Sequence, residues 1–147
     1  MKTIKHILKL KEKKIWATTP DTSVFDALKI LAEHDVGALP VMDGKNLVGI
    51  FSERDYARKV ILEGKSSMNI PVSEIMSTNL VLITPDQTTE QGLAIMTTKH
   101  VRHLPVIHEH KLVGFISIGD LVKSIIDELN LVIDKLGQYK SEKSGMY

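Results

Sequence analysis

A serine followed three residues later by an aspartate occurs twice in the chain, each time after an apolar run. Ser52 and Asp55 follow residues 47–51, and Ser117 and Asp120 follow residues 112–116. Serine caps a helix start, and an acid at the third helical position completes a capping box. The amides and partial positive charge of a helix start suit phosphate, while an ionised carboxylate suits a vicinal diol because it only accepts hydrogen bonds. Each pair therefore predicts a phosphate and sugar site, or else a helix cap and nothing more.

These pairs belong to an internal repeat with a constant offset of 65 residues, which is gapless over residues 19–61 and 84–126. The identical positions include Pro20/Pro85, Leu39/Leu104, Pro40/Pro105, Val41/Val106 and Gly49/Gly114. An internal repeat is a stronger signal of fold than any local motif. We therefore expect two copies of one supersecondary unit, packed about a pseudo-twofold axis.

The hydrophobic pattern of each repeat predicts the order strand, helix, strand, strand, helix, and so an α/β fold. In the first repeat the predicted strands cover residues 15–18, 38–42 and 47–51, with one helix from Ser23 to Gly37 and another over residues 53–62. The equivalent strands of the second repeat are residues 80–84, 103–107 and 112–116. Asp43-Gly44 predicts a hairpin turn. Pro40 cannot donate to a strand ladder, so it should lie at a sheet edge or a strand start.

The remaining segments complete the predicted organisation. Residues 3–10 form a short docking helix with Ile4, Ile7 and Leu8 buried, and residues 71–76 echo it. We expect the docking helix, the first repeat and a linker in residues 1–68, and the second repeat in residues 69–130. Residues 131–147 are expected to form a helical extension and a disordered tail that begins near residue 140.

The last helix is predicted to start after Ser117 and to run to about residue 136, well beyond its counterpart in the first repeat. Its apolar residues follow a heptad-like spacing: Val122, Ile125, Leu129, Val132 and Leu136. This seam either packs on its own domain or forms a dimer contact, and the sequence favours neither.

Composition narrows the class of protein. The 147 residues carry a net charge of +1 and are 43% hydrophobic, which is ordinary for a globular domain and gives no reason to expect nucleic acid as a partner. The chain has no cysteine, which excludes disulfides and fits a reducing cytosol. No apolar run approaches the roughly 18 residues of a membrane span, and lysines interrupt any secretory signal. We therefore expect a cytoplasmic protein without a membrane partner.

Motifs for catalysis and metal binding are weak. The sequence has no Gly-x-Ser-x-Gly elbow, no Walker loop and no dinucleotide fingerprint, so an enzyme is not expected. His100, His103, His108 and His110 lie close in sequence. Imidazole can bind a metal, but adjacent turn residues rarely converge on one ion, so no metal site is expected.

The repeat, the Leu-Pro-Val strand and the Gly-x-x-Ser-x-x-Asp signature together resemble a tandem pair of CBS domains, also called a Bateman module. The resemblance covers roughly residues 10–127 and is greatest to stand-alone bacterial proteins, particularly over residues 48–56. It implies regulatory binding of an adenine ligand, AMP above all, with ADP, ATP, NAD or S-adenosylmethionine as alternatives and no required cofactor. It also implies two clefts between the repeats, a homodimer shaped as a flat disc, and a regulated protein in trans.

The resemblance also implies roles for particular residues. In the family the serine of the motif meets the phosphate and the aspartate binds the ribose hydroxyls, which carries over to Ser52 with Asp55 and Ser117 with Asp120. The residues that surround base and sugar carry over to Thr18, Thr19, Pro20, Ala38, Leu39 and Pro40, and in the second repeat to Ile83, Thr84, Pro85, His103, Leu104 and Pro105.

The two copies differ in charge. Arg54 lies inside the first motif, where its guanidinium either adds a charge-assisted contact to a phosphate or is a solvated helix residue. The second motif lacks that charge, but the second copy gains Arg102 and His103 near its Pro105. We expect at least one competent cleft, and unequal affinities if both bind.

Three other functions stay open on the sequence. A ligand-free interaction or dimerisation module would use its helices and leave the Ser-x-x-Asp pairs as caps. A nucleic-acid binder has only the N-terminal lysines in its favour, and a small enzyme lacks a catalytic motif.

Overall fold

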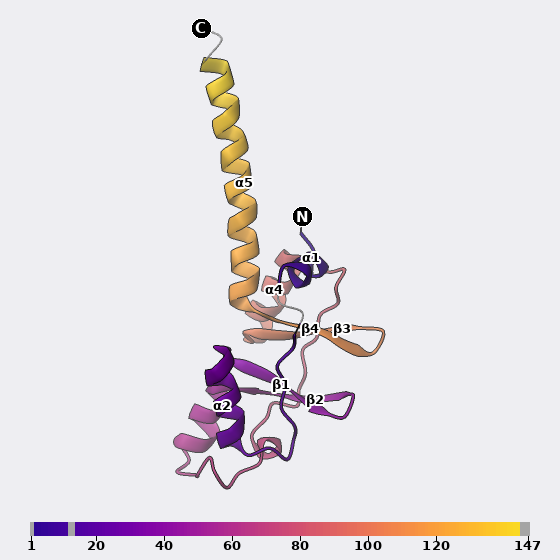
Figure 1. The fold of residues 1–147 in the computed structure, drawn as a ribbon, viewed down its shortest axis with the longest axis vertical. Helices are drawn as coiled ribbons and strands as arrows, with labels where there is room; N and C mark the ends of the chain where they lie inside the picture. The colour runs from indigo at the N-terminus through magenta and orange to yellow at the C-terminus, as the bar shows by residue number, and fades with distance from the viewer. Residues whose placement is uncertain (1, 12–13, 145–147) are drawn as a thin grey trace.

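The computed structural model describes residues 2–11 and 14–144, with side chains described as far as Tyr139. The elements are α1 (Ile4–Leu10), α2 (Val24–His34), β1 (Ala38–Asp43), β2 (Asn46–Ser52), α3 (Glu53–Tyr56), a π-helix (Ala57–Ile61), a 3₁₀-helix (Val72–Glu74), α4 (Thr89–Lys99), β3 (His103–His108), β4 (Lys111–Ser117) and α5 (Ile118–Ser144). Figure 1 shows the two repeats stacked along the long axis, with α5 rising from the second. The expected α/β class and the repeated unit are confirmed.

Each repeat contains one antiparallel hairpin, and the two hairpins share one register. Ala38 pairs with Ser52 across β1 and β2, and His103 pairs with Ser117 across β3 and β4. Both hairpins carry a β-bulge at the equivalent position. Gly44 has a φ of 61°, which confirms the predicted turn. The register brings the start of the first strand beside the serine that ends the second.

The strand predicted at residues 15–18 is wrong except for Thr18, which forms a single parallel bridge to β1. The Thr18 amide donates to the Pro40 carbonyl at 3.1 Å, and the Met42 amide donates to the Thr18 carbonyl at 2.8 Å. The next bonds of a parallel ladder would need the backbone nitrogens of Pro40 and Pro20 as donors, and proline has no N–H. The two prolines therefore limit this ladder to one bridge.

The strand predicted at residues 80–84 of the second repeat is also wrong, except for a single bridge at Ile83. The Ile83 amide donates to the Pro105 carbonyl at 3.1 Å, and its carbonyl accepts from the Ile107 amide at 2.9 Å. Pro85 and Pro105 end this ladder on its two sides. Both hairpins are two-stranded sheets, so the edge position predicted for Pro40 is confirmed.

The predicted helix starts are confirmed at their caps. Ser23 accepts a hydrogen bond from the Asp26 amide at 3.1 Å, and Thr88 forms a reciprocal capping box with Gln91. Helix α3 begins after Ser52 as expected and continues into the π-helix.

The predicted helix end at Gly37 is wrong, because α2 ends at His34. Asp35 takes the left-handed conformation with a φ of 50°, and its amide reaches the Leu31 carbonyl. His100 does the same after α4, with a φ of 55°. Aspartate and histidine adopt this conformation more readily than most residues, so glycine is not required at either end.

The two hydrophobic cores exchange their docking segments. Ile4 and Ile7 of α1 are buried in the core of the second repeat, beside Leu104 and Ile116. The core of the first repeat instead takes its equivalent apolar residues from the segment after the linker, namely Ile70, Val72 and Ile75. The predicted burial of Ile4 and Ile7 is therefore confirmed, with the second repeat as their partner, while Leu8 is only half-buried against the same core. The chain crosses between the repeats twice.

Helix α5 is longer than predicted. It continues through Ser144, so the tail expected to be disordered from residue 140 is helical as far as it is described, and residues 145–147 lie outside the described part. Lysine, glutamine and glutamate dominate its last turns and are good helix formers, and one glycine costs only about 1 kcal/mol there. Within the described residues, no helix is long and apolar enough to cross a bilayer.

We predict that Ile4→Ala destabilises the protein by about 2–5 kcal/mol, because it removes a fully buried side chain from the second core. Leu10→Ala is the matched control in the same helix, since Leu10 is 73% exposed, and it should change stability by less than about 0.5 kcal/mol. Urea unfolding measures both. Equal small effects would show that α1 is not part of the second core.

Candidate functional site

Two similar cavities lie between the repeats. The Ser52 cavity, of about 490 Å³, is lined from the first repeat by residues that include Ser52, Asp55 and Arg58, and from the second by residues that include Val81 and Arg102. The Ser117 cavity, of about 540 Å³, is lined by the second repeat's Ser117 and Asp120 and by residues of the first repeat that include Trp16, His34 and Ala38. Each motif therefore faces residues of the other repeat.

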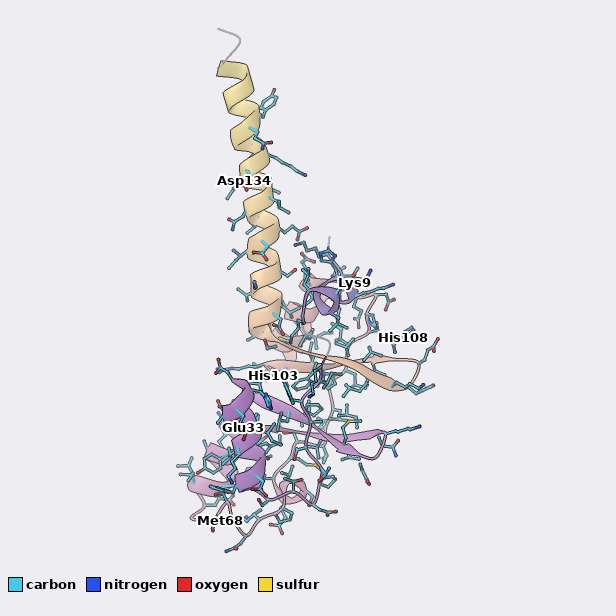
Figure 2. The ribbon with its side chains drawn as sticks, viewed as in Figure 1. Lys9, Glu33, Met68, His103, His108 and Asp134 are labelled. Atoms are coloured by element: carbon cyan, nitrogen blue, oxygen red, sulfur yellow. The ribbon has the colours of Figure 1, made fainter. Side chains whose placement is uncertain are left out.

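Each motif faces the other repeat because the starts of the two hairpins pack closely together. A Cβ placed on Gly37 would lie 3.5 Å from the His103 ring, so the start of β1 and the start of β3 touch. Gly37 and His103 line both cavities. Figure 2 shows His103 at the boundary between the two repeats. The two cavities thus share a wall and cannot be formed by one repeat alone.

Both Ser-x-x-Asp pairs are capping boxes. The Asp55 amide donates to Ser52 Oγ at 3.1 Å, and the Ser52 amide donates back to Asp55 Oδ2 at 3.1 Å. Ser117 and Asp120 make the same two bonds at 3.2 and 2.8 Å. The capping role predicted for these pairs is confirmed.

The expectation of free amides at the helix starts is wrong for most of the first turn. The Glu53 amide donates to the Gly37 carbonyl at 3.1 Å, and the Ile118 amide donates to the Arg102 carbonyl at 2.9 Å. The third helical amide in each repeat is taken by the serine cap. Cationic side chains, more than helix amides, are therefore the groups that these cavities could offer to an anion.

A lysine lies against the aspartate in each cavity. Lys11 Nζ is 2.6 Å from Asp120 Oδ2 and also donates to the Phe115 carbonyl at 3.0 Å. Lys59 Nζ is 3.2 Å from Asp55 Oδ1 and donates to the Ile75 carbonyl at 3.0 Å. The two lysines come from non-equivalent positions of the repeat, and each places an ammonium beside the motif aspartate of its cavity.

The two aspartates differ in how far they are engaged. The side chain of Asp55 is 12% exposed, and its Oδ1 atom faces Lys59 as well as the Ser77 hydroxyl at 3.4 Å. The hydrogen bonds of Asp120 to described residues all go to Oδ2, and its side chain is 25% exposed. Asp120 therefore keeps an acceptor oxygen for a ligand, while Asp55 would have to exchange one of its bonds.

Aromatic rings gather in the Ser117 cavity from both repeats. Trp16 stacks on His34 with 3.3 Å between ring centroids, and Lys14 Nζ lies 4.3 Å from the Trp16 ring. His103 stacks on Phe115 at 5.7 Å. Flat aromatic walls beside a carboxylate suit a purine base attached to a sugar.

The Ser52 cavity is instead positively charged. Its lining includes the cationic side chains of Arg54, Arg58, Lys59 and Arg102, against the two acids Glu53 and Asp55. In the Ser117 cavity two lysines are balanced by two aspartates. Several cations around one cavity suit a ligand with more than one phosphate.

A family model of the CBS domain matches the chain twice, at residues 4–62 and at residues 72–127. The chain belongs to the CBS-domain family. This confirms the resemblance inferred from the repeat and from the Gly-x-x-Ser-x-x-Asp signature.

Similar CBS proteins come from plants and bacteria. The mitochondrial CBS domain-containing protein CBSX3 of Arabidopsis thaliana is 37% identical over 147 residues, which cover 93% of this chain and 71% of that protein. YhcV of Bacillus subtilis is 34% identical over 103 residues, or 70% and 73% of the two chains. A CBS-domain structure from Burkholderia ambifaria MC40-6 is 47% identical, covers 85% of this chain and 94% of its own, and has a TM-score of 0.83.

The CBS pair brings eight of the predicted site residues to a cavity: Ala38, Ser52, Arg54, Asp55, Arg102, His103, Ser117 and Asp120. The other ten predicted site residues do not line either cavity: Thr18, Thr19, Pro20, Leu39, Pro40, Ile83, Thr84, Pro85, Leu104 and Pro105. Side chains alternate along a strand. The residues after Ala38 and His103 therefore turn into the two cores, where Leu39 is 1% and Leu104 0% exposed.

Sequence reasoning missed Trp16, His34 and Arg58, and also the two lysines that contact the motif aspartates, Lys11 and Lys59. Arg58 lies one helical turn after Arg54, and this spacing could have found it. Trp16 gave no such signal, because it reaches the Ser117 motif only through the packing of the two repeats.

The four neighbouring histidines do not converge. His103 lies at the repeat boundary, and His108 lies at the end of the β3–β4 hairpin, well away from it (Figure 2). Among the described residues, no three histidine, aspartate or glutamate side chains are placed to hold a metal ion.

We predict that the stability of this CBS pair falls as the pH drops below about 6.5, partly through His103. Burial lowers the pKa of His103 below its ordinary value of 6.5, and Lys11 and Arg102 add to this while Asp120 opposes it. The unfolded chain then binds a proton on this imidazole more readily than the folded chain does. The stability that is present above about pH 6.5 is therefore lost as the pH falls toward the pKa of His103 in the folded protein.

Urea unfolding between about pH 7.5 and pH 5.5 measures this loss, which should be smaller in His103→Gln than in the wild type. His6→Gln is the control, because His6 is exposed on α1. An identical pH dependence in the wild type and His103→Gln would contradict the prediction.

Proposed function

We propose that this CBS pair is a regulatory binding module for an adenine nucleotide, with AMP, ADP, ATP and NAD as the candidate ligands. The module carries out no catalysis and passes its ligand state to another protein in trans. The serine hydroxyls of both motifs serve as helix caps, which leaves them poorly suited to act as nucleophiles.

The observation that carries this proposal is the construction of two equivalent cavities from both repeats. Each combines an acid for sugar hydroxyls with a cationic side chain for phosphate and with apolar or aromatic walls for a base. A ligand that fills such a cavity contacts both repeats at once. It would therefore favour one relative arrangement of the repeats over others, and a partner protein would read that arrangement.

The two cavities differ in the ligand that each would favour. The aromatic walls and the accessible Asp120 oxygen of the Ser117 cavity suit the adenosine part of a ligand. The four cations of the Ser52 cavity suit a di- or triphosphate. Unequal affinities of the two cavities follow from these differences in charge.

The fold itself is known to accommodate adenosine compounds. The CBS domain pair of MJ0100 was solved in complex with 5′-methylthioadenosine and S-adenosyl-L-methionine, and it is 23% identical to this chain with a TM-score of 0.76. At that identity the likeness concerns the fold, so the ligand of this chain has to be determined by direct binding.

A ligand-free interaction module is the second candidate. It is favoured by the contacts that already engage Asp55, because a ligand would have to displace Lys59 or Ser77 from it. Helix α5, with its exposed apolar face, would then carry the function.

We predict that Asp120→Asn weakens binding in the Ser117 cavity by about 10- to 100-fold, the loss expected when a charge-assisted hydrogen bond to a sugar hydroxyl is removed. Asparagine keeps an acceptor for the helix cap, so the fold should be retained. Calorimetric titration with AMP, ADP, ATP, NAD and S-adenosylmethionine measures the effect. Asp55→Asn tests the Ser52 cavity in the same way.

Asp26→Asn is the matched control, because Asp26 holds the third helical position of α2 outside both cavities. Its affinities should equal those of the wild type. Absence of binding by every ligand to the wild type would reject the nucleotide proposal and leave the interaction module.

We also predict that Arg58→Gln weakens the binding of ATP more than the binding of AMP. The ratio of the dissociation constant for ATP to that for AMP should rise by at least about tenfold. The reason is that Arg58 belongs to the cationic lining that extra phosphates would reach. Lys45→Gln, in the exposed β1–β2 turn, removes the same charge away from the cavity and should leave the ratio unchanged. An equal loss for both ligands would place Arg58 outside phosphate recognition.

A further inference from the structure

The docking helix α1 contacts the second Ser-x-x-Asp motif directly. Ile4 and Ile7 anchor this helix in the core of the second repeat (Figure 1). Leu8 lies so close to Gly114, the glycine of the motif, that a Cβ on this glycine would collide with it. Lys11 follows at the C-terminal end of α1, where its amide donates to the Ile7 carbonyl at 3.1 Å. Because Leu8 and Lys11 also line the Ser117 cavity, a ligand there would meet α1 as well as the motif.

Two groups of the second repeat hold the ammonium of Lys11 in place. Its Nζ atom is 2.6 Å from Asp120 Oδ2 and donates to the Phe115 carbonyl at 3.0 Å. A lysine ammonium has three N–H donors, and the described residues provide no acceptor for the third. The side chain of Lys11 is 36% exposed, so the third donor is open to a ligand in the cavity.

The Ser117 hydroxyl provides a second donor beside it. Its oxygen accepts from the Asp120 amide at 3.2 Å, and its own hydrogen has no acceptor among the residues that the structure describes. The first motif differs here, because the Ser52 hydroxyl donates to Asp55 Oδ2 at 2.9 Å. The second motif therefore combines two available donors, one of them charged, with the accessible Oδ1 oxygen of Asp120.

The positive charge of the two cavities comes from different parts of the chain. Within the described residues, the lysines and arginines that line the Ser117 cavity are Lys11 and Lys14, both from the N-terminal segment. Lys14 Nζ lies over the Trp16 ring, at 4.3 Å, which leaves Lys11 as the cation next to the motif. The Ser52 cavity instead takes most of its cations from the helical segment that follows its own motif. An anionic group in the Ser117 cavity thus depends on the N-terminal segment for its counter-charge.

We propose that Lys11 binds the phosphate of a phosphorylated nucleoside in the Ser117 cavity and thereby couples this ligand to the docking of α1. The inference rests on the nucleotide-binding function proposed above, and it names the residue that distinguishes a nucleotide from a nucleoside. The sugar hydroxyls donate to Asp120 Oδ1, while Lys11 keeps its bond to Oδ2. The third N–H of Lys11 and the Ser117 hydroxyl then donate to the phosphate.

This contact makes the docking of α1 sensitive to the ligand. A phosphate bound by Lys11 joins α1 to a ligand that the second repeat also holds. The ligand stabilises the docked helix by the same factor by which the docked helix strengthens ligand binding, because linkage is reciprocal. A nucleoside without a phosphate does not reach the ammonium and gives no such stabilisation. The order of the N-terminal segment therefore reports the phosphorylation state of the ligand.

The first experiment titrates AMP and adenosine into the protein and follows the fluorescence of Trp16. This residue is the only tryptophan of the chain, and it lines the Ser117 cavity but not the Ser52 cavity. AMP should bind the wild type more tightly than adenosine does. Lys11→Met should lower the ratio of the adenosine dissociation constant to the AMP dissociation constant by about 10- to 100-fold, because it removes a charge-assisted hydrogen bond to the phosphate.

Two further variants separate the charge of Lys11 from its packing. Lys9→Met is the matched control, because Lys9 is exposed on the same helix and lines neither cavity (Figure 2). Its ratio of dissociation constants should equal that of the wild type. Lys11→Arg restores a cationic donor at the end of α1 and should recover most of the ratio that Lys11→Met loses.

The second experiment measures the exchange of the α1 amide hydrogens with deuterium at saturating ligand. AMP should slow this exchange in the wild type by at least about fivefold, since the phosphate contact stabilises the docked helix. Adenosine should change it by less than about twofold, because it lacks the group that Lys11 binds. Lys11→Met should abolish the effect of AMP, whereas Lys9→Met should keep it.

Three outcomes would overturn this proposal and leave the nucleotide function standing. They are an unchanged ratio of dissociation constants in Lys11→Met, equal protection of α1 by AMP and adenosine, and tighter binding of both ligands by Lys11→Met, which would show that Lys11 obstructs the cavity. A different result rejects the nucleotide function and this inference together. It is the absence of both a fluorescence change and a calorimetric signal when nucleotides are added to the wild type.

Discussion

The exchange of docking segments between the two cores is the interaction on which the rest of the structure depends. Ile4 and Ile7 are buried in the second repeat, while Val72 and Ile75 are buried in the first. Because each core is completed by residues that the chain reaches only after passing the other repeat, neither repeat can bury its apolar face by itself. The contact between the repeats creates the two cavities, since both repeats contribute lining residues to each.

The electrostatics of the cavities follow from the same exchange. Lys59 reaches Asp55 from within its own repeat, but the equivalent position in the second repeat is Ser124, which is buried. Lys11, carried to the second repeat by α1, takes over that role beside Asp120. The acids of both cavities therefore already have cationic neighbours, and a ligand that bonds to an aspartate would compete with a lysine for it. Asp120 has an accessible carboxylate oxygen, so a ligand can bond to it at a smaller cost than to Asp55.

Within the hairpins the two repeats differ in their side chains and not in their backbone. The hairpins share their register, their bulge and the prolines that reduce the neighbouring strand to one bridge. The side chains around them differ, with aromatic rings in one cavity and arginines in the other, and only the second repeat continues into a long helix. One scaffold thereby provides two cavities of different chemistry and, at α5, an exposed apolar surface.

The sequence by itself determined the repeat, because the identical residues recur at a constant offset of 65 positions. It also determined the helix caps and the hairpins, because each depends on residues that are close together in the chain. It also identified Ser52, Asp55, Ser117 and Asp120 as the polar centre of the site. Only the tertiary structure decided which residues face them. Side-chain alternation turned Leu39 and its neighbours inward, and the packing of the two repeats brought residues such as Trp16 to the motif of the other repeat. No local pattern encodes that contact, because it arises from the exchange of segments between two cores that are distant along the chain.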